Sequence, residues 1–256
     1  MNLIQNILTN NDCYKTGQKI TVKGLMIHSV GCSQPNASVF LKNWNKAGVQ
    51  IGVHAVIDGN TGTVYQCLPW NHRGWHGGGS SNNTHIGVEM CEPATIKYTS
   101  GANFTDTNPT KTKETVMRTY NAAVELFAYL CKQYNLNPLT DIVGHKEGHK
   151  LGIASNHGDP DHLWSKFGLS MDGFRKAVQV QMNQGMTSVP TTEEKPVSGG
   201  SVPYRVQINN VVDIYSAPAV SQVNVKGIYT IVEEKNGYGK LKSGVGWVKL
   251  SDVKKL

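Results

Sequence analysis

Residues 141–160 restrict the possible folds of this chain more than any other segment. The run Asp141-Ile-Val-Gly predicts a short buried strand, and the residues after it predict a polar loop. The loop holds histidines and a carboxylate with ligand or acid–base chemistry: His145, His149, His157 and Asp159. Because loops at strand ends usually carry functional groups, the segment predicts a binding or catalytic site at the end of a buried strand.

The composition is typical of a globular protein and favours an anionic partner. The 256 residues are 39% hydrophobic and carry a net charge of +7. The chain is therefore long enough to bury an ordinary core without disulfides. A basic chain suits nucleic acid, a membrane surface or an acidic cell-wall polymer. The lysines are dispersed, without arginine-rich runs or RNA-binding aromatic motifs, which argues against nucleic acid.

The cysteines and the N-terminal residues predict where the protein is made. Five cysteines lie far apart and form no C-x-x-C pair, which indicates small buried thiols kept reduced. Residues 1–12 have no basic segment and no long apolar run, so no secretory signal is expected. No apolar run approaches the roughly 18 residues of a membrane span, so no membrane insertion is expected. We expect synthesis in the cytoplasm, with any target outside the cell reached after lysis or through a holin-type pore.

Apolar patterns in the first 183 residues predict strands and helices. Strands are expected at residues 24–30, 51–57, 62–68, 84–91 and 141–144, with the second and third forming a hairpin. Helices are expected at residues 36–47, 113–134 and 171–182. The residues of the first helix expected to face inward are Val39, Phe40, Trp44 and Ala47. Residues 1–24 predict a short helix and turn, and residues 95–112 predict a loop.

The rest of the chain has a different pattern. Residues 184–202 are rich in Pro, Gly, Ser and Thr and have no periodicity, which predicts a flexible linker. From residue 203 onward, short apolar strands alternate with Asn-Gly and Ser-Gly turns and predict a small all-β barrel. We therefore expect a catalytic domain at residues 1–183, a linker at 184–202 and a second domain at 203–256.

Three side chains that are remote in sequence form a candidate metal site. His28 ends one predicted strand, His145 follows another, and Asp159 lies in the loop beyond. Two imidazoles and one carboxylate would leave the fourth position of a tetrahedral zinc ion open for water, as in catalytic zinc sites. Zinc lowers the pKa of such a water toward about 7. The alternative interpretation of His28 is a hydrogen-bonded core histidine.

Two more residues are candidates for catalysis. Glu89 interrupts an apolar strand, where a carboxylate is costly unless it is paired or near a cation. It is the candidate general acid or base, with a solvent-facing position on an edge strand as the alternative. His157, two residues before Asp159, is the candidate partner of a developing oxyanion. His54 and Cys131 are interpreted as packed core residues.

Six short motifs occur in order over about residues 20–180. They are Met26-Ile-His28-Ser, Gly52-Val-His-Ala-Val-Ile-Asp-Gly, Trp75-His-Gly-Gly, Ile86-Gly-Val-Glu89, Ile142-Val-Gly-His145 and His157-Gly-Asp159-Pro160. In this order they resemble the zinc-dependent N-acetylmuramoyl-L-alanine amidases of the type 2 amidase family. That family includes phage endolysins, bacterial autolysins and peptidoglycan recognition proteins.

The resemblance implies both a fold and an activity. The fold is an α/β catalytic domain with a mixed central sheet flanked by helices and a zinc ion in a groove. The activity is hydrolysis of the amide bond between N-acetylmuramic acid and L-alanine of the stem peptide, with zinc-bound water as the nucleophile. The partner is peptidoglycan, through both its glycan strand and its stem peptide. By the same resemblance, the zinc ligands are His28, His145 and Asp159, the acid/base carboxylate is Glu89, and the substrate groove wall contains Trp75 and His76.

Two positions depart from the family pattern. Many members have lysine where this chain has His157, which leaves the charge of the oxyanion partner open. The common Asp-Pro-Gly is here Asp159-Pro160-Asp161-His162, which adds polar groups near the expected ion. His149 or His162 is therefore an alternative zinc ligand.

The C-terminal region resembles bacterial SH3-like cell-wall-binding domains. The matching segments include Tyr215-Ser-Ala-Pro, Gly227-Ile-Tyr-Thr-Ile-Val-Glu-Glu and Gly246-Trp247-Val. A tethered binding module would concentrate the catalytic domain at the wall, and a purely stabilising appendage is the alternative.

Two other functions compete with the amidase hypothesis. A recognition protein would bind peptidoglycan without cutting it, but family members of that kind lack a third zinc ligand, whereas this chain has Asp159. A cytoplasmic amidase that recycles muropeptides fits the missing signal but not the wall-binding region. The sequence leaves open the peptidoglycan chemotype, phage or bacterial origin, and the oligomeric state.

Overall fold

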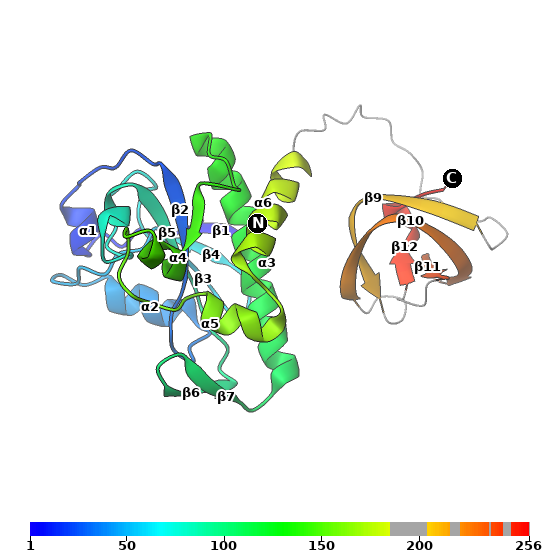
Figure 1. Cartoon of the computed structure of the whole chain (residues 1–256), viewed down its shortest axis with the longest axis horizontal. Helices are drawn as coiled ribbons and strands as arrows, with labels where there is room; N and C mark the ends of the chain where they lie inside the picture. The colour runs from blue at the N-terminus through cyan, green and yellow to red at the C-terminus, as the bar shows by residue number, and fades with distance from the viewer. Residues whose placement is uncertain (185–203, 216–220, 236, 243–246, 256) are drawn as a thin grey trace. The chain divides into compact units, whose positions relative to one another are not determined.

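The structure is a computed structural model that describes residues 1–184, 204–215, 221–235, 237–242 and 247–255 (Figure 1). The chain divides into two compact units, Met1–Met186 and Thr187–Leu256, which are described separately. All but the first residue of the predicted linker at 184–202 lies outside the described residues. The exact domain boundaries therefore remain predictions.

The first unit is built on a six-stranded mixed sheet. Its strands, in spatial order, are β1 (Leu3–Gln5), β4 (Val64–Gln66), β3 (Ala55–Ile57), β5 (His85–Met90), β2 (Gly24–Ser29) and β8 (Ile142–Gly144). The strands β3, β5, β2 and β8 run parallel to one another, and β4 pairs antiparallel with β3. The predicted strands and the predicted hairpin are therefore present, and the mixed sheet implied by the family resemblance is confirmed.

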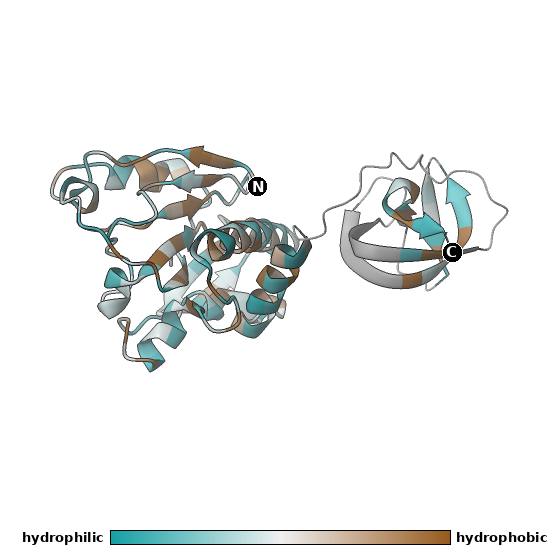
Figure 2. Cartoon of the chain, turned by 90° about the horizontal axis from the view of Figure 1, so that it is seen from above, coloured by the Kyte–Doolittle hydropathy of each residue, from teal (hydrophilic) through white to brown (hydrophobic). Residues whose placement is uncertain are grey.

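Alternation along β2 separates the core from the opposite face of the sheet. Leu25 and Ile27 pack into the main hydrophobic cluster with the long helix α3 (Pro109–Tyr134) and with α6 (Met171–Gln184). Successive side chains of a strand point to opposite faces, so Met26 and His28 face away from this cluster. In Figure 2, hydrophobic segments lie on the strands of this unit, and its helices carry both kinds of residue. One face of the sheet therefore packs against the main hydrophobic cluster, and the opposite face carries His28 and is available for a functional site.

Some local predictions were wrong. Residues 95–112 contain a hairpin of β6 (Ile96–Ser100) and β7 (Asn103–Asp106) instead of a loop, because the rings of Tyr98 and Phe104 meet edge to face and pack on the core. The loop after β8 forms the short helices α4 (His145–Lys150) and α5 (Asp161–Trp164). The N-terminal segment adds the edge strand β1 next to the expected helix α1 (Asp12–Lys15).

The inward face of helix α2 (Ala37–Trp44) also differs from the prediction. The helix buries Ala37 and Leu41, while Val39 is 37% exposed. Phe40 and Trp44 are partly buried against the same cluster. The helix ends at Trp44, so the predicted inward residue Ala47 lies outside it and is exposed, and the buried positions are Ala37 and Leu41. The five cysteines are free, as expected, yet Cys32 is exposed and not buried.

Phe174 joins α6 to α3, and its removal is expected to be costly. It is fully buried and its ring contacts the rings of Tyr120, Phe127 and Trp164. Replacement by alanine removes an aromatic side chain from a packed core, so Phe174→Ala should lower the free energy of unfolding by about 3–5 kcal/mol. Urea unfolding measures this loss. The control Val180→Ala, at a 44% exposed position of the same helix, should change stability by less than about 0.5 kcal/mol.

The second unit contains an antiparallel five-stranded sheet. Its strands are β9 (Tyr204–Tyr215), β10 (Ser221–Lys235), β11 (Tyr238–Leu241), β12 (Trp247–Lys249) and β13 (Lys254–Lys255). Among the short strands predicted from residue 203 onward, residues 204–215 form one long strand, whose pairing shifts between Val225 and Gly227 of β10. Its small core includes Val206, Ile231 and Val248. This sheet is compatible with an SH3-like domain.

Among the described residues, no helix has the length and apolar character needed to cross a bilayer.

Candidate metal centre and its pocket

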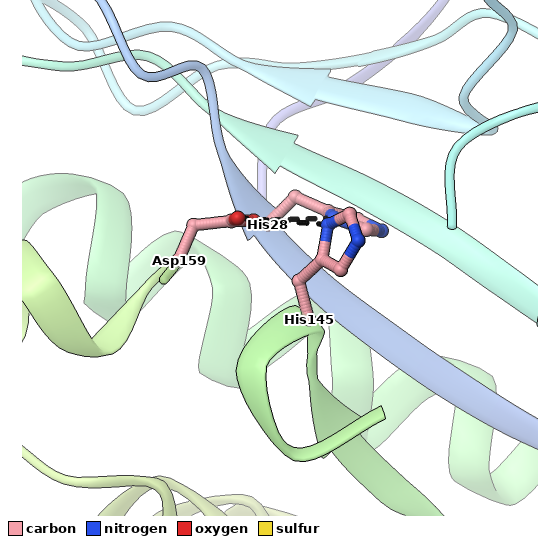
Figure 3. A group of neighbouring side chains, drawn as sticks. All are labelled: His28, His145 and Asp159. Atoms are coloured by element: carbon pink, nitrogen blue, oxygen red, sulfur yellow. Dashed lines mark hydrogen bonds and ion pairs between the residues drawn. The ribbon is translucent and has the colours of Figure 1, made fainter. Parts of the chain in front are cut away.

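Three ligand-type side chains meet at the carboxyl ends of β2 and β8. His28 lies on β2, His145 is the first residue of α4 directly after β8, and Asp159 lies in the loop before α5. The parallel pairing of Ile27 with Gly144 brings the two histidines side by side, because the carboxyl ends of neighbouring parallel strands lie at one edge of a sheet. Figure 3 shows the three side chains pointing toward one another.

The distances in this cluster fit a tetrahedral cation. Nδ1 of His28 lies 3.0 Å from Nδ1 of His145 and 3.2 Å from Oδ2 of Asp159, and Nδ1 of His145 lies 3.5 Å from Oδ1 of Asp159. One ligand atom from each residue lies within 4.8 Å of the other two. Ligands about 2.0–2.2 Å from a tetrahedral zinc ion lie roughly 3.3–3.6 Å apart. The three distances lie within about 0.3 Å of this range, so a small adjustment lets these residues hold zinc with one coordination position left over.

The three side chains of this cluster are buried, so the negative charge of Asp159 needs a positive charge beside it. The exposed fractions of His28, His145 and Asp159 are 1%, 5% and 8%. Burial, opposed by Asp159, lowers the pKa of His28. Burial by itself raises the pKa of Asp159, but hydrogen bonds from His145 and His28 outweigh it and hold that pKa below its usual value. The ionised carboxylate needs either protons on the rings or a cation between the three side chains.

Glu89 lies on the same side of the sheet as His28. The two residues are register partners on the neighbouring parallel strands β5 and β2, so their side chains point the same way. The strand β5 is internal to the sheet, which rules out the edge-strand interpretation. Burial raises the pKa of Glu89 well above its usual value, and the charges of Asp159 and Glu92 raise it further. Oε2 of Glu89 is buried and has no hydrogen-bond partner among the described residues.

A pocket of about 540 Å³ opens over this cluster. Its lining includes six of the seven predicted site residues, all but His28: Trp75, His76, Glu89, His145, His157 and Asp159. Trp75 is 45% exposed and its ring contacts the guanidinium of Arg73. His157 is exposed, its ring lies tilted against that of His145 with 4.5 Å between the ring centroids, and its Nδ1 contacts Ser155 Oγ. The fold thus gathers these residues at one cavity.

His54, His149 and His162 make contacts other than with the three candidate ligands. Burial lowers the pKa of His54 to about 4, and its ring nitrogens contact the backbone of His72 and Gly87, as expected for a packed histidine. The ring of His149 contacts a backbone carbonyl, and that of His162 contacts Tyr98. In the part of the chain that the structure describes, the group suited to a metal contains neither of these two alternatives.

One side of the pocket holds a polar network that was not predicted from the sequence. Glu92 is fully buried and accepts hydrogen bonds from Tyr98 at 2.7 Å and from the backbone of Gly31 at 3.1 Å. His162 lies 2.6 Å from the Tyr98 hydroxyl and 3.5 Å from Glu92. Tyr98 and His162 both line the pocket. The sequence signal for this network was Glu92, a carboxylate just beyond an apolar strand. Its partner Tyr98 could not be placed, because it lies on the hairpin that was predicted to be a loop.

The chain is similar in sequence to known amidases. A family model described as N-acetylmuramoyl-L-alanine amidase (Amidase_2) matches residues 18–162, more than half of the 256-residue chain. The N-acetylmuramoyl-L-alanine amidase XlyA of Bacillus subtilis (strain 168) is 30% identical over 102 residues, which are 37% of this chain and 33% of that protein. The matched region is thus about a third of the length of this curated relative.

Two solved structures share the fold of the first unit. The hydrolase AmiA of Staphylococcus aureus, in complex with its ligand, has a TM-score of 0.52 and 18% identity, covering 74% of this chain and 86% of that chain. The solution structure of the PlyG catalytic domain has a TM-score of 0.51 and 18% identity, covering 75% of this chain and 100% of that chain. These two matches show that the first unit has the same α/β fold as these proteins. The family model is more specific, and the chain belongs to the N-acetylmuramoyl-L-alanine amidase family.

Proposed function

We propose that this chain is a zinc-dependent peptidoglycan hydrolase that cuts the amide bond between N-acetylmuramic acid and L-alanine of the stem peptide, as a lysin would. The observation that carries the proposal is the convergence of His28, His145 and Asp159 below an open pocket, in a member of the amidase family. When bound, zinc supplies Lewis-acid polarisation of the amide carbonyl and makes hydroxide available near neutral pH.

The proposed role of Glu89 is proton transfer. Hydrolysis adds hydroxide to the carbonyl carbon and a proton to the leaving amino group of L-alanine. The half-buried carboxylate, on the same sheet face as His28 and in the pocket lining, takes the proton of the attacking water and passes it to that amine. Its raised pKa brings it closer to the operating pH, where an acid–base group works best.

The proposed roles of His157 and Trp75 concern the substrate. His157 is exposed in the pocket and its Nδ1 contacts Ser155 Oγ, so Nε2 is the free ring nitrogen that, in its protonated form, would donate a hydrogen bond to the developing oxyanion. The exposed Trp75 ring offers a flat apolar surface to a sugar or a peptide.

Digestion of purified peptidoglycan tests the activity directly. The expected result is muramic acid fragments with a free lactyl carboxyl group and peptides with a free L-alanine amino terminus, both identified by mass. A chelator should stop the release and added zinc should restore it. Zinc binding without new amino termini would instead favour a recognition protein, and cleavage at another bond would contradict the proposal.

We also propose that the second unit binds the wall. Its basic residues and its antiparallel sheet suit a cell-wall anchor, which would raise the concentration of the first unit near its substrate. Removal of residues 187–256 should reduce the fraction of protein that sediments with purified walls. Equal sedimentation of both forms would leave this unit without a binding role.

A further inference from the structure

His76 was expected only in the wall of the substrate groove, but its ring also makes hydrogen bonds inside the protein. Its Nδ1 lies 3.0 Å from Nε2 of His28, and its Nε2 lies 3.1 Å from the carbonyl oxygen of His85. The rings of His76 and His28 meet edge to face at 5.1 Å. Both ring nitrogens of His76 are therefore engaged inside the protein.

The direction of these hydrogen bonds follows from the chemistry of the acceptor. A carbonyl oxygen can only accept, so Nε2 of His76 carries a hydrogen and donates it to His85. A neutral imidazole carries one ring hydrogen, which leaves Nδ1 of His76 as an acceptor. Nε2 of His28 must then donate to it, and Nδ1 of His28 keeps its lone pair for the centre of the cluster.

The surrounding chain holds His76 in this orientation. Oδ1 of Asn82 accepts from the backbone N–H groups of His76 at 2.9 Å and of Gly77 at 2.8 Å. The strand β5 has glycine at position 87 below the ring, and a Cβ there would overlap with the imidazole of His76. Two separate segments are thus adapted to the position of this one ring.

We infer that His76 is a positioning residue that fixes the tautomer and the ring orientation of His28, and thereby strengthens zinc binding. The inference rests on the proposed zinc site. Outer partners of a metal-bound histidine typically change metal affinity by about 10- to 100-fold. His76 would act through His28, so its first effect is on metal affinity and any effect on turnover follows from it.

A matched pair of substitutions separates this role from simple packing. Asparagine and leucine have nearly the same size, but only asparagine has a side-chain oxygen that can accept from Nε2 of His28. We expect His76→Leu to weaken zinc binding by about 10- to 100-fold, measured by competition with a chelator in the full-length chain. His76→Asn should lie within a few-fold of the unsubstituted protein. Circular dichroism checks that both variants are folded.

Each outcome bears on a different claim. Equal zinc affinity in His76→Leu and the unsubstituted protein would overturn the inference, as would equal losses in His76→Leu and His76→Asn. If the unsubstituted protein binds no zinc, the proposed metal site itself fails.

Nitrogen NMR of the zinc-loaded, unsubstituted protein tests the same point without a variant. The imidazole shifts of His28 should show zinc at Nδ1 and hydrogen at Nε2. The reverse assignment would also overturn the inference.

Discussion

Replacing Asp159 with alanine is expected to abolish zinc retention and peptidoglycan cleavage together. Asp159 is the only anion of the cluster, and its two oxygens lie 3.2 and 3.5 Å from the ring nitrogens of His28 and His145. Without it, two buried imidazoles would face a divalent cation with no neutralising charge. We expect zinc affinity to fall by more than the roughly 100-fold upper range for outer partners. Metal analysis after dialysis and release of amino termini from peptidoglycan measure the two losses.

Asp161 provides the control for this experiment. It is a carboxylate two residues further along, and it does not belong to the metal-type group within the described residues. Asp161→Ala should therefore keep both zinc and activity. If Asp159→Ala retained zinc at the level of Asp161→Ala, then His28, His145 and Asp159 would not form the metal site.

Replacing Glu89 with glutamine is expected to separate zinc binding from catalysis. Glutamine has the size of glutamate but cannot carry a proton to and from the reacting groups. Loss of a general acid–base group typically costs about 100- to 10,000-fold in rate, so turnover should fall by that amount while zinc content stays unchanged. Normal turnover in Glu89→Gln would remove this residue from the mechanism.

The same substitution predicts a pH-dependent gain in stability of the metal-free protein. Burial, and then the charges of Asp159 and Glu92, raise the pKa of Glu89 in the folded state above its ordinary value of 4.5. The folded state therefore keeps a proton that the unfolded state has released, and stability is lost as pH rises through that window. Glu89→Gln removes this loss, so in a chelator it should be more stable than the unsubstituted chain at pH 7.5. The difference should shrink at pH 4, and urea unfolding at both pH values measures it.

Local patterns were sufficient for the parts of the fold that repeat a simple period. The apolar stripe of residues 113–134 predicts most of α3, and the apolar runs predict β2, β5 and β8 within a few residues. The same patterns failed where tertiary contacts decide. Tyr98 and Phe104 join into a hairpin because each packs against the other and against a core built from distant segments, and the packing on the core is not visible in the local sequence.

The candidate site shows the same division. Strand-end positions and ordered motifs single out His28, His145, Glu89 and Asp159 without any structure. Glu92 and its contacts with Tyr98 and His162 were missed, because three residues from a loop, a hairpin and a helix meet only after folding. The role inferred for His76 depends on a hydrogen bond to His28, 48 positions away, and on the absence of a side chain at Gly87.

The sequence by itself indicated which side chains are candidates for catalysis or metal binding and where the strands that present them end. This was possible because the spacing of apolar residues, and a carboxylate such as Glu89 inside an apolar run, can be recognised within a short segment of the sequence. Only the tertiary structure decided that β2 lies between β5 and β8. That order brings Nδ1 of His28 to 3.0 Å from Nδ1 of His145, across 117 positions of the chain. The contact depends on strand pairing, which is a property of the folded chain and not of any single segment.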